Sequence, residues 1–269
     1  MAIGTRMSKN QNKIKFEYKE MSSGKVFVPV CIDGHQIEFF LDTGATFTGL
    51  KNIELLKDQK IIGGHKFQSA SGLPLVARQC IANELSLNGY ARQDVEVSIF
   101  PEKFQHSTTL GIDFFQNINF SFLSSSKKLL IEEEGLPLAS NFHLTNKGHI
   151  ALDFLLQNES YTCIWDTGAE LTVVSKNLRE SHSECFINPV EINNGKDSTG
   201  EKIDFVLWDM KSFEIGCTMF RDQKVIEMDF TALRRFFLGT TEMILGFNTV
   251  ISADWTFDME KRKYGVDTI

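Results

Sequence analysis

The stretch FFLDTGATFTGL at residues 39–50 places an aspartate, a threonine and a glycine directly after an apolar run. Asp and Gly form turns and Thr can hydrogen-bond to the backbone, so one such stretch predicts no more than the end of a strand. A second stretch, CIWDTGAELTVV at residues 163–174, repeats nearly the same pattern. The repetition indicates that the chain consists of two related halves.

The residues before the two aspartates align without a gap at an offset of 124 (166 − 42). VPVCIDGHQIEFFLD lies over LDFLLQNESYTCIWD, and apolar residues alternate in both segments. This period of two is typical of half-buried strands. The dipeptides Asp33-Gly34 and Gln157-Asn158 separate the alternating runs and favour tight turns. Each half is therefore predicted to begin with a β-hairpin whose second strand ends at the aspartate.

A second pair of matching segments lies near the end of each half. TLGIDFFQNINFSFLSSSKKLLI from Thr109 lies over ILGFNTVISADWTFDMEKRKYGV from Ile244, at an offset of 135 (246 − 111). Phe120 then aligns with Trp255, and Phe122 with Phe257. The second half has gained 11 residues (135 − 124). We expect them in MDFTALRRFFLGTTE, where the apolar residues at 233, 236 and 237 have helical spacing.

These alignments divide the chain into four parts. Residues 1–24 form an N-terminal segment that can supply an interface strand, and residues 25–132 form the first half. Residues 133–146 form a linker, and residues 147–269 the second half. Each half also has a polar turn between strand-like flanks, which favours a projecting hairpin. The turn residues are Ser69, Ala70, Ser71 and Gly72 in the first half, and Asn193, Asn194 and Gly195 in the second.

Composition excludes several classes of function. The chain has 269 residues, is 42% hydrophobic and contains 23 Phe, which favours a globular protein over a disordered one. Its apolar residues are too scattered to span a bilayer, so no membrane association is expected. The formal net charge of -7, without clustered Lys and Arg, argues against a nucleic-acid partner.

Cysteine and histidine usage argues against disulfides and metals. Five Cys without regular spacing favour free thiols over a disulfide framework. The six His are dispersed, and the close His–Cys pair in HSEC at 182–185 has no second pair to complete a metal site. No metal and no cofactor are therefore expected. The N-terminal residues show no signal-peptide pattern, which predicts a cytoplasmic protein and leaves signal-independent export open.

The repeated aspartate gives the chain a chemistry that one copy would lack. Two related halves can face each other across a pseudo-two-fold axis, which brings Asp42 beside Asp166. Two adjoining carboxyl groups share one proton, so one acts as an acid while the other, as a base, activates a water that attacks a peptide carbonyl. Gly44 and Gly168 let backbone come close to the carboxyl groups. The hydroxyl groups of Thr43 and Thr167 can lock the two loops together.

These motifs resemble those of a known family. LDTGAT and WDTGAE, each followed by an apolar-apolar-Gly segment (TLG and ILG), are similar to the aspartic peptidases. The DTGA form and LGIDFFQNINFSF look most like the retropepsin-like (retroviral-type) branch. The resemblance covers residues 25–132 and 147–267. Retropepsin-like enzymes usually assemble two identical chains, whereas this chain holds both halves, as pepsin-like enzymes do.

The resemblance implies an all-β, bilobal fold. Two β-barrel lobes would be related by a pseudo-two-fold axis, with a cleft between them and the two polar turns as flaps. It also implies an endopeptidase that binds an extended peptide or protein substrate, and the presence of both halves in one chain predicts that it is active as a monomer. Asp42 and Asp166 would be catalytic. The supporting residues would be Thr43, Gly44, Ala45, Thr167, Gly168 and Ala169 in the loops, and Leu110, Gly111, Leu245 and Gly246 in the apolar-Gly segments.

Two alternatives to a constitutive peptidase remain. A catalytically silent protein could keep the fold and bind peptides in the same cleft. Two intact DTGA segments count against it, because a binding module has no need of two carboxylates that repel each other. The other alternative is a latent enzyme in which the N-terminal segment or the linker occupies the cleft.

Overall fold

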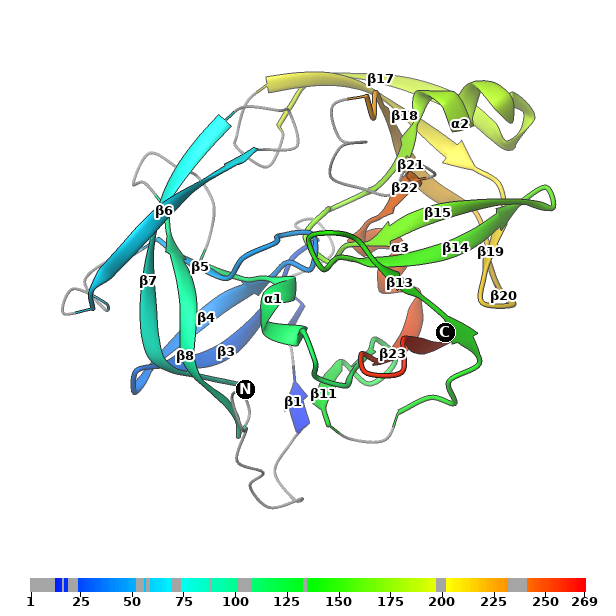
Figure 1. Cartoon of the computed structure of the whole chain (residues 1–269). Helices are drawn as coiled ribbons and strands as arrows, with labels where there is room; N and C mark the ends of the chain where they lie inside the picture. The colour runs from blue at the N-terminus through cyan, green and yellow to red at the C-terminus, as the bar shows by residue number, and fades with distance from the viewer. Residues whose placement is uncertain are drawn as a thin grey trace.

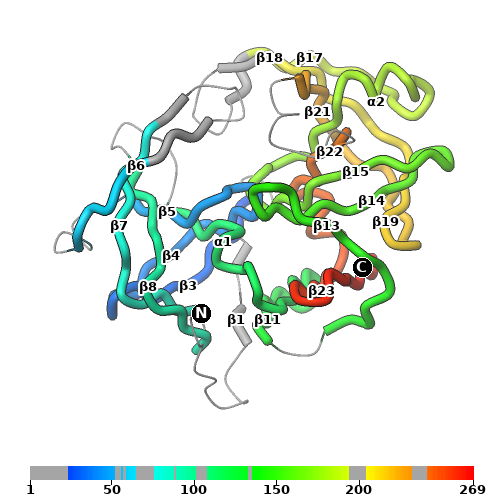
Figure 2. The backbone as a smooth tube through the Cα atoms, in the orientation of Figure 1, coloured from blue at the N-terminus to red at the C-terminus, as the bar shows by residue number. Residues whose placement is uncertain are grey.

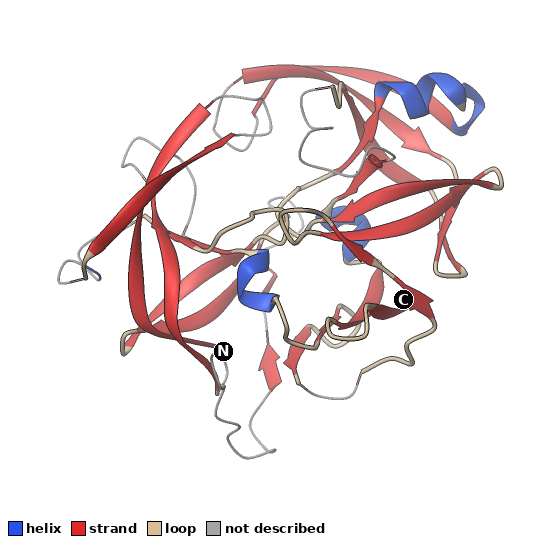
Figure 3. Ribbon diagram, in the orientation of Figure 1, coloured by secondary structure: helices blue, strands red, loops and turns tan. Residues whose placement is uncertain are grey.

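Strands make up most of the computed structural model, in which helices are few and short (Figure 3). The structure describes residues 13–15, 17–18, 24–51, 56, 59–68, 74–87, 89–100, 108–132, 135–196, 202–231 and 241–269. The described strands form three sheets. Within these ranges, no helix is both long and apolar enough to cross a bilayer.

One sheet has eight strands, all from residues 17–110 (Figure 1, blue to green). They are β2 (Glu17–Tyr18), β3 (Val26–Ile32), β4 (His35–Leu41), β5 (Gly49–Leu50), β6 (Ile61–Gln68), β7 (Pro74–Leu87), β8 (Tyr90–Ile99) and β9 (Thr109–Leu110). Their order in the sheet is β2-β3-β4-β9-β5-β8-β7-β6. The predicted hairpin is confirmed as β3 and β4, whose turn residues Asp33 and Gly34 have φ of 46° and 81°.

A second sheet draws ten strands from the rest of the chain. They are β13 (His143–Leu144), β14 (Ile150–Leu156), β15 (Glu159–Trp165), β16 (Thr172–Ser175), β17 (Phe186–Lys196), β18 (Lys202–Met210), β19 (Phe213–Ile215), β20 (Thr218–Phe220), β21 (Gln223–Met228) and β22 (Thr241–Leu245). The order is β17-β18-β21-β16-β22-β15-β14-β19-β20, with β13 also paired to β14. In reverse, this order contains the run β14-β15-β22-β16-β21-β18-β17. It corresponds strand for strand to the run β3-β4-β9-β5-β8-β7-β6 of the first sheet. The hairpin predicted for this half is confirmed as β14 and β15, with Gln157 and Asn158 at φ of 50° and 69°.

The third sheet joins strands from both halves. It contains β1 (Lys13–Lys15), β10 (Phe120–Leu123), β11 (Lys128–Ile131), β12 (Ser140–Asn141), β23 (Ala253–Asp258) and β24 (Lys263–Thr268). The order is β1-β11-β10-β23-β24-β12. Where β10 meets β23, Phe120 pairs with Phe257 and Phe122 with Trp255. The sequence alignment instead matches Phe120 with Trp255 and Phe122 with Phe257, so the two pairs are exchanged across the strands. Such an exchange is how an interface between two copies of one unit is arranged.

A continuous buried core runs through both halves of the described chain. Trp165, which precedes Asp166, lies 4.9 Å from Phe257 and 6.0 Å from Phe120, measured between ring centroids. The aromatic cluster ties the end of β15 to the third sheet. The described residues include the helices α1 (Ile112–Phe115), α2 (Lys176–Ser181) and α3 (Phe247–Val250) and a 3-10 turn (Ser183–Cys185). All five cysteines are free, and those at 80, 163 and 185 are buried.

The two halves of the chain lie side by side (Figure 2), and β1 and β11 lie at the lower side of Figure 1. Residues of the expected N-terminal segment supply β1 and β2, and residues of the expected linker supply β12 and β13. The extra segment of the second half ends in β22. Its expected helical residues at 233, 236 and 237 lie outside the described residues.

Candidate active site

Each of the two aspartates directly follows the second strand of a hairpin. Asp42 comes after β4 and donates its backbone N–H to the Leu110 carbonyl at 3.1 Å. Asp166 comes after β15 and donates to the Leu245 carbonyl, also at 3.1 Å. The parallel neighbours β9 and β22 carry these leucines. The Leu-Gly segments therefore hold the start of each aspartate loop.

The loops interlock through their threonines. Thr43 donates its backbone N–H to Thr167 Oγ1 at 3.1 Å, and Thr167 donates its own to Thr43 Oγ1 at 3.0 Å. The hydroxyl groups donate onward, from Thr43 to the Trp165 carbonyl at 3.1 Å and from Thr167 to the Leu41 carbonyl at 2.9 Å. Both threonines are buried. Each half thus satisfies buried polar groups of the other.

Gly44 and Gly168 leave room for the carboxyl group of the opposite half. A Cβ atom at Gly44 would lie 2.2 Å from Asp166 Oδ2, and one at Gly168 would lie 2.1 Å from Asp42 Oδ1. Real Cβ atoms do not come that close to another atom. The glycines are therefore required by the close approach of backbone to carboxyl group.

The two carboxyl groups hydrogen-bond to each other but have different surroundings. Asp166 Oδ1 accepts the backbone N–H groups of Gly168 at 2.7 Å, Gly44 at 3.1 Å and Ala169 at 3.2 Å. Asp42 Oδ1 accepts that of Ala45 at 2.9 Å, and the Gly44 N–H, which donates to Asp166, also stabilises the Asp42 carboxylate. Because N–H donors stabilise a carboxylate and Asp166 has three to the two of Asp42, the negative charge is favoured on Asp166.

Burial raises the pKa of both aspartates. The negative charge of Asp166 raises the pKa of Asp42 further, and backbone N–H donors partly offset the rise at both aspartates, with one more donor at Asp166. The pair is therefore expected to hold one proton, on Asp42, over an extended pH range. Both residues are only half-buried, so one side of the pair reaches solvent. Such a pair offers an acid and a base side by side.

A further hydrogen-bonded layer supports the first aspartate loop. Thr48 Oγ1 accepts the Gly111 N–H at 3.1 Å. Asp113 in turn accepts from Thr48, with its Oδ1 lying 2.9 Å from the backbone N and 2.8 Å from the hydroxyl oxygen. The second half repeats this layer with Thr172, Gly246 and Asn248. A carboxylate and an amide therefore perform the same structural task in the two halves.

These supporting residues were not identified from the sequence, although a signal was present. Thr48 and Thr172 differ by 124, and Asp113 and Asn248 by 135, which are the two offsets of the alignment. His149 also contacts the first loop, at Thr46, and no sequence pattern singles out this histidine. The contact joins positions 103 residues apart.

The polar turns expected as flaps belong to two long hairpins. β6 pairs with β7, and β17 pairs with β18, and both hairpins lie at the upper side of Figure 1. Ser69, Ala70, Ser71 and Gly72 lie outside the described residues. Asn193 and Asn194 fall at a register shift within β17, and Gly195 pairs with Ile203. The connection between β17 and β18 therefore lies beyond Gly195.

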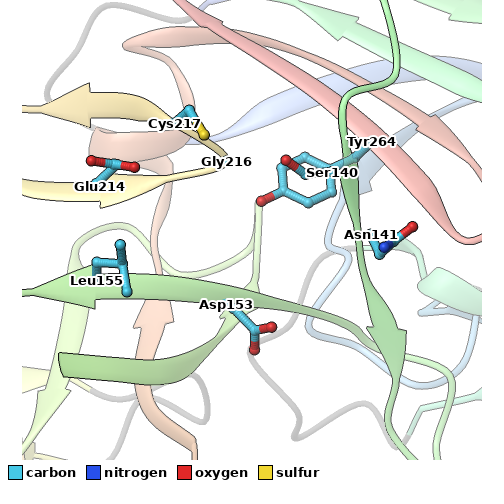
Figure 4. Close-up of a pocket in the computed structure, with 8 residues that line it drawn as sticks. All are labelled: Ser140, Asn141, Asp153, Leu155, Glu214, Gly216, Cys217 and Tyr264. Atoms are coloured by element: carbon cyan, nitrogen blue, oxygen red, sulfur yellow. The ribbon is translucent and has the colours of Figure 1, made fainter. Parts of the chain in front are cut away.

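A separate pocket of about 310 Å³ opens between β14, β19 and β24. Figure 4 shows its two carboxylates, Asp153 and Glu214, together with the Cys217 thiol and the Tyr264 ring. None of the aspartate-loop residues lines it. Elsewhere too, across the described residues, His, Cys, Asp and Glu form no group of three that could hold a metal ion.

Comparison with known families relates part of the chain to peptidases. Residues 28–114 match a family model described as aspartyl protease. The matched range begins in β3, contains Asp42 and the Leu110-Gly111 segment, and ends in α1. No curated protein matches the chain. The match supports a peptidase and agrees with a mostly β structure.

Proposed function

We propose that the chain is an aspartic endopeptidase in which Asp42 and Asp166 form one catalytic dyad. The observation that carries this proposal is the reciprocal contact between the two loops. Each threonine hydroxyl accepts the N–H of the other, and each glycine leaves room for the opposite aspartate. Two turns that merely ended strands would have no reason to place two carboxyl groups in contact, because the pair resists full ionisation.

We further propose a bilobal molecule of two retropepsin-like β-barrel lobes related by a pseudo-two-fold axis. The repeated strand order of the two large sheets supports it. So does the exchanged pairing of Phe120 and Phe122 with Phe257 and Trp255. Both loops come from one chain and their lobes share a core, so the dyad is complete in a monomer.

The reaction needs only water, the peptide and the two aspartates. A water between the carboxyl groups gives its proton to Asp166 as its oxygen bonds to the peptide carbonyl carbon. Asp42 gives its proton to the carbonyl oxygen, which forms a tetrahedral diol. The C–N bond then breaks as the amine takes a proton from Asp166, and a diol hydroxyl returns one to Asp42. The raised pKa of Asp42 and the N–H donors on Asp166 support this assignment of roles.

The substrate class that fits is a peptide in extended conformation. Such a peptide can hydrogen-bond through its backbone while its side chains alternate into pockets. The hairpins β6–β7 and β17–β18 are proposed as the flaps that close over it. Large apolar side chains are exposed on these hairpins, which favours apolar substrate residues. They are Ile61, Ile62 and Val76 on the first hairpin, and Ile187 and Val190 on the second.

Incubation of the purified chain with a peptide library, read by mass spectrometry, tests the proposal. We expect internal cleavage by the wild-type chain and at least about 100-fold slower cleavage by Asp166→Asn. Asp113→Asn is the matched control, because an asparagine already fills the equivalent position in the second half. It should retain most of the activity. Peptide binding without cleavage by the wild-type chain would contradict the proposal and favour a catalytically silent peptide-binding protein.

A further inference from the structure

His149 is a buried side chain of the second half that contacts the aspartate loop of the first. It lies just before β14, at the end of the turn that follows β13, and is 4% exposed. Its Nε2 atom lies 3.3 Å from Thr46 Oγ1. The ring also hydrogen-bonds to the Gly44 backbone in a way that favours its protonated form, so the ring is the donor and the Gly44 carbonyl the acceptor. Gly44 is the residue of the first loop whose N–H donates to Asp166.

The hydrogen bonds of Thr145 fix which ring nitrogen carries the proton. Thr145 Oγ1 accepts two backbone N–H groups, from His149 at 3.1 Å and from Lys147 at 3.3 Å. Both lone pairs of the hydroxyl oxygen are then in use, so its hydrogen must be donated. The acceptor is His149 Nδ1, at 3.2 Å. Nδ1 is therefore unprotonated, and Nε2 carries the hydrogen that points at the first loop.

We propose that His149 is a positioning residue that, as a neutral ring, holds the Asp42 loop so that the Gly44 N–H stays on Asp166. The inference rests on the proposed dyad and goes beyond it, because it explains how the two carboxyl groups come to differ. Thr145 hydrogen-bonds to Nδ1 of the ring, and Nε2 of the ring contacts the loop. Loss of this anchor removes a donor from Asp166 and so disfavours its carboxylate form.

The opposite loop has a different neighbour. The position equivalent to His149 is Lys25 (149 − 124), an exposed residue whose Nζ lies 5.3 Å from the Phe40 ring centroid. Glu170 (46 + 124), also exposed, takes the place of Thr46. A buried neutral ring therefore anchors the Asp42 loop, while charged, exposed side chains flank the Asp166 loop. The two carboxyl groups therefore have unequal surroundings, and the anchored loop is the one whose Gly44 N–H donates to Asp166, as the proposal requires.

The surroundings keep the ring neutral in acid. Burial lowers the pKa of His149 to about 4, and the charge of Lys147 on the same turn acts in the same direction. The facing loop carries the Asp42 carboxyl group, and the Gly44 N–H of that loop donates to the Asp166 carboxyl group. Protonation of Nδ1 would also break its bond from Thr145, whose hydroxyl oxygen has no lone pair left to accept.

The test compares His149→Leu with His149→Gln, which keeps a neutral N–H donor, and with His182→Leu. His182 is a matched control because it is also buried, at 3% exposure, and bonds to Tyr161 and Gln157 instead of a loop. The readout is the acid limb of kcat/KM against pH for a cleaved peptide. We expect His149→Leu to move this limb up by about one pH unit, because the Asp166 carboxylate loses a hydrogen bond in this variant. His149→Gln should lie nearer the wild type, and His182→Leu should leave the limb in place.

An unchanged limb in His149→Leu, or an equal shift in His182→Leu, would overturn the inference. If His149→Leu does not fold, Thr145→Val replaces it, with Thr145→Ser as the variant that keeps the hydroxyl. Only the valine variant should then move the limb upwards. If the wild-type chain cleaves no peptide, the proposed function fails, and the inference is tested by ¹³C NMR titration of the aspartate carboxyl groups in the whole chain. The inference is supported if the lower of the two pKa values of the aspartate pair is higher in His149→Leu than in the wild type. An unchanged value overturns the inference.

Discussion

The glycine after each aspartate-threonine pair is set by the carboxyl group that it faces. Gly44 and Gly168 belong to different halves, yet each lies against the aspartate of the other. Their backbone approach also brings the Gly44 N–H to Asp166. A side chain at either position would therefore disturb the distance between the carboxyl groups and the donors that hold them.

Gly44→Ala is expected to lower both stability and turnover. The added Cβ would lie 2.2 Å from Asp166 Oδ2, so the loops must separate. Overpacking of this kind costs about 1–3 kcal/mol, and displaced carboxyl groups should slow cleavage about 100-fold. Denaturant unfolding and peptide cleavage measure the two effects. Gly63→Ala is the control, because the nearest atom to its added Cβ is 3.9 Å away. Wild-type turnover in Gly44→Ala would show that the close approach is not needed.

Asp113→Asn is expected to change the pH dependence of stability. Burial raises the pKa of Asp113 above the ordinary 3.8, despite its bonds from Thr48. The folded chain thus binds this proton more tightly than the unfolded chain, so the residue's contribution to stability falls as pH rises from the ordinary value through the raised one. The asparagine does not titrate. The variant should therefore gain stability relative to wild type between acid and neutral pH, measured by denaturant unfolding at both. A difference that does not vary with pH would contradict the raised pKa.

At the scale of elements, each loop is held by its own sheet and by the other loop. The strands β9 and β22 fix the start of each loop, and the threonine interlock joins the two. The hydroxyl groups of Thr43 and Thr167 are both acceptor and donor in that interlock. A loop that lost its partner would leave buried polar groups unsatisfied.

Thr43→Val is expected to destabilise the chain, whereas Thr43→Ser should not. Valine keeps the shape but leaves the Thr167 N–H without its acceptor and the Trp165 carbonyl without its donor. Unsatisfied buried groups cost about 1–3 kcal/mol. The free energies of unfolding of the two variants, measured by urea denaturation, give the comparison. Equal stability of the valine and serine variants would mean that the interlock contributes nothing.

The parts of this arrangement that follow local rules could be predicted from the sequence. The turns at Asp33-Gly34 and Gln157-Asn158 follow from the positive φ that such residues tolerate. The contact between the two loops follows from the repeat. By contrast, Asp113 contacts Thr48 across 65 residues, and His149 contacts Thr46 across 103. No local pattern encodes such contacts, and a lone histidine in a sequence does not reveal its neighbours.

At the scale of the whole molecule, one core and one shared sheet hold the two halves together. The third sheet pairs β10 with β23, and the aromatic rings beneath Asp166 come from both halves. The position of each aspartate is therefore fixed by structure that the other half helps to build. Mutual dependence of the two aspartates is the expected consequence.

The most direct test of this account is the rate of peptide cleavage in Asp42→Asn, Asp166→Asn and the double variant. Residues that act as one unit lose about as much activity singly as together. We predict that each single variant loses at least about 100-fold, and that the double variant is hardly slower than either. Near-normal cleavage by either single variant, or losses that multiply in the double variant, would contradict the shared dyad.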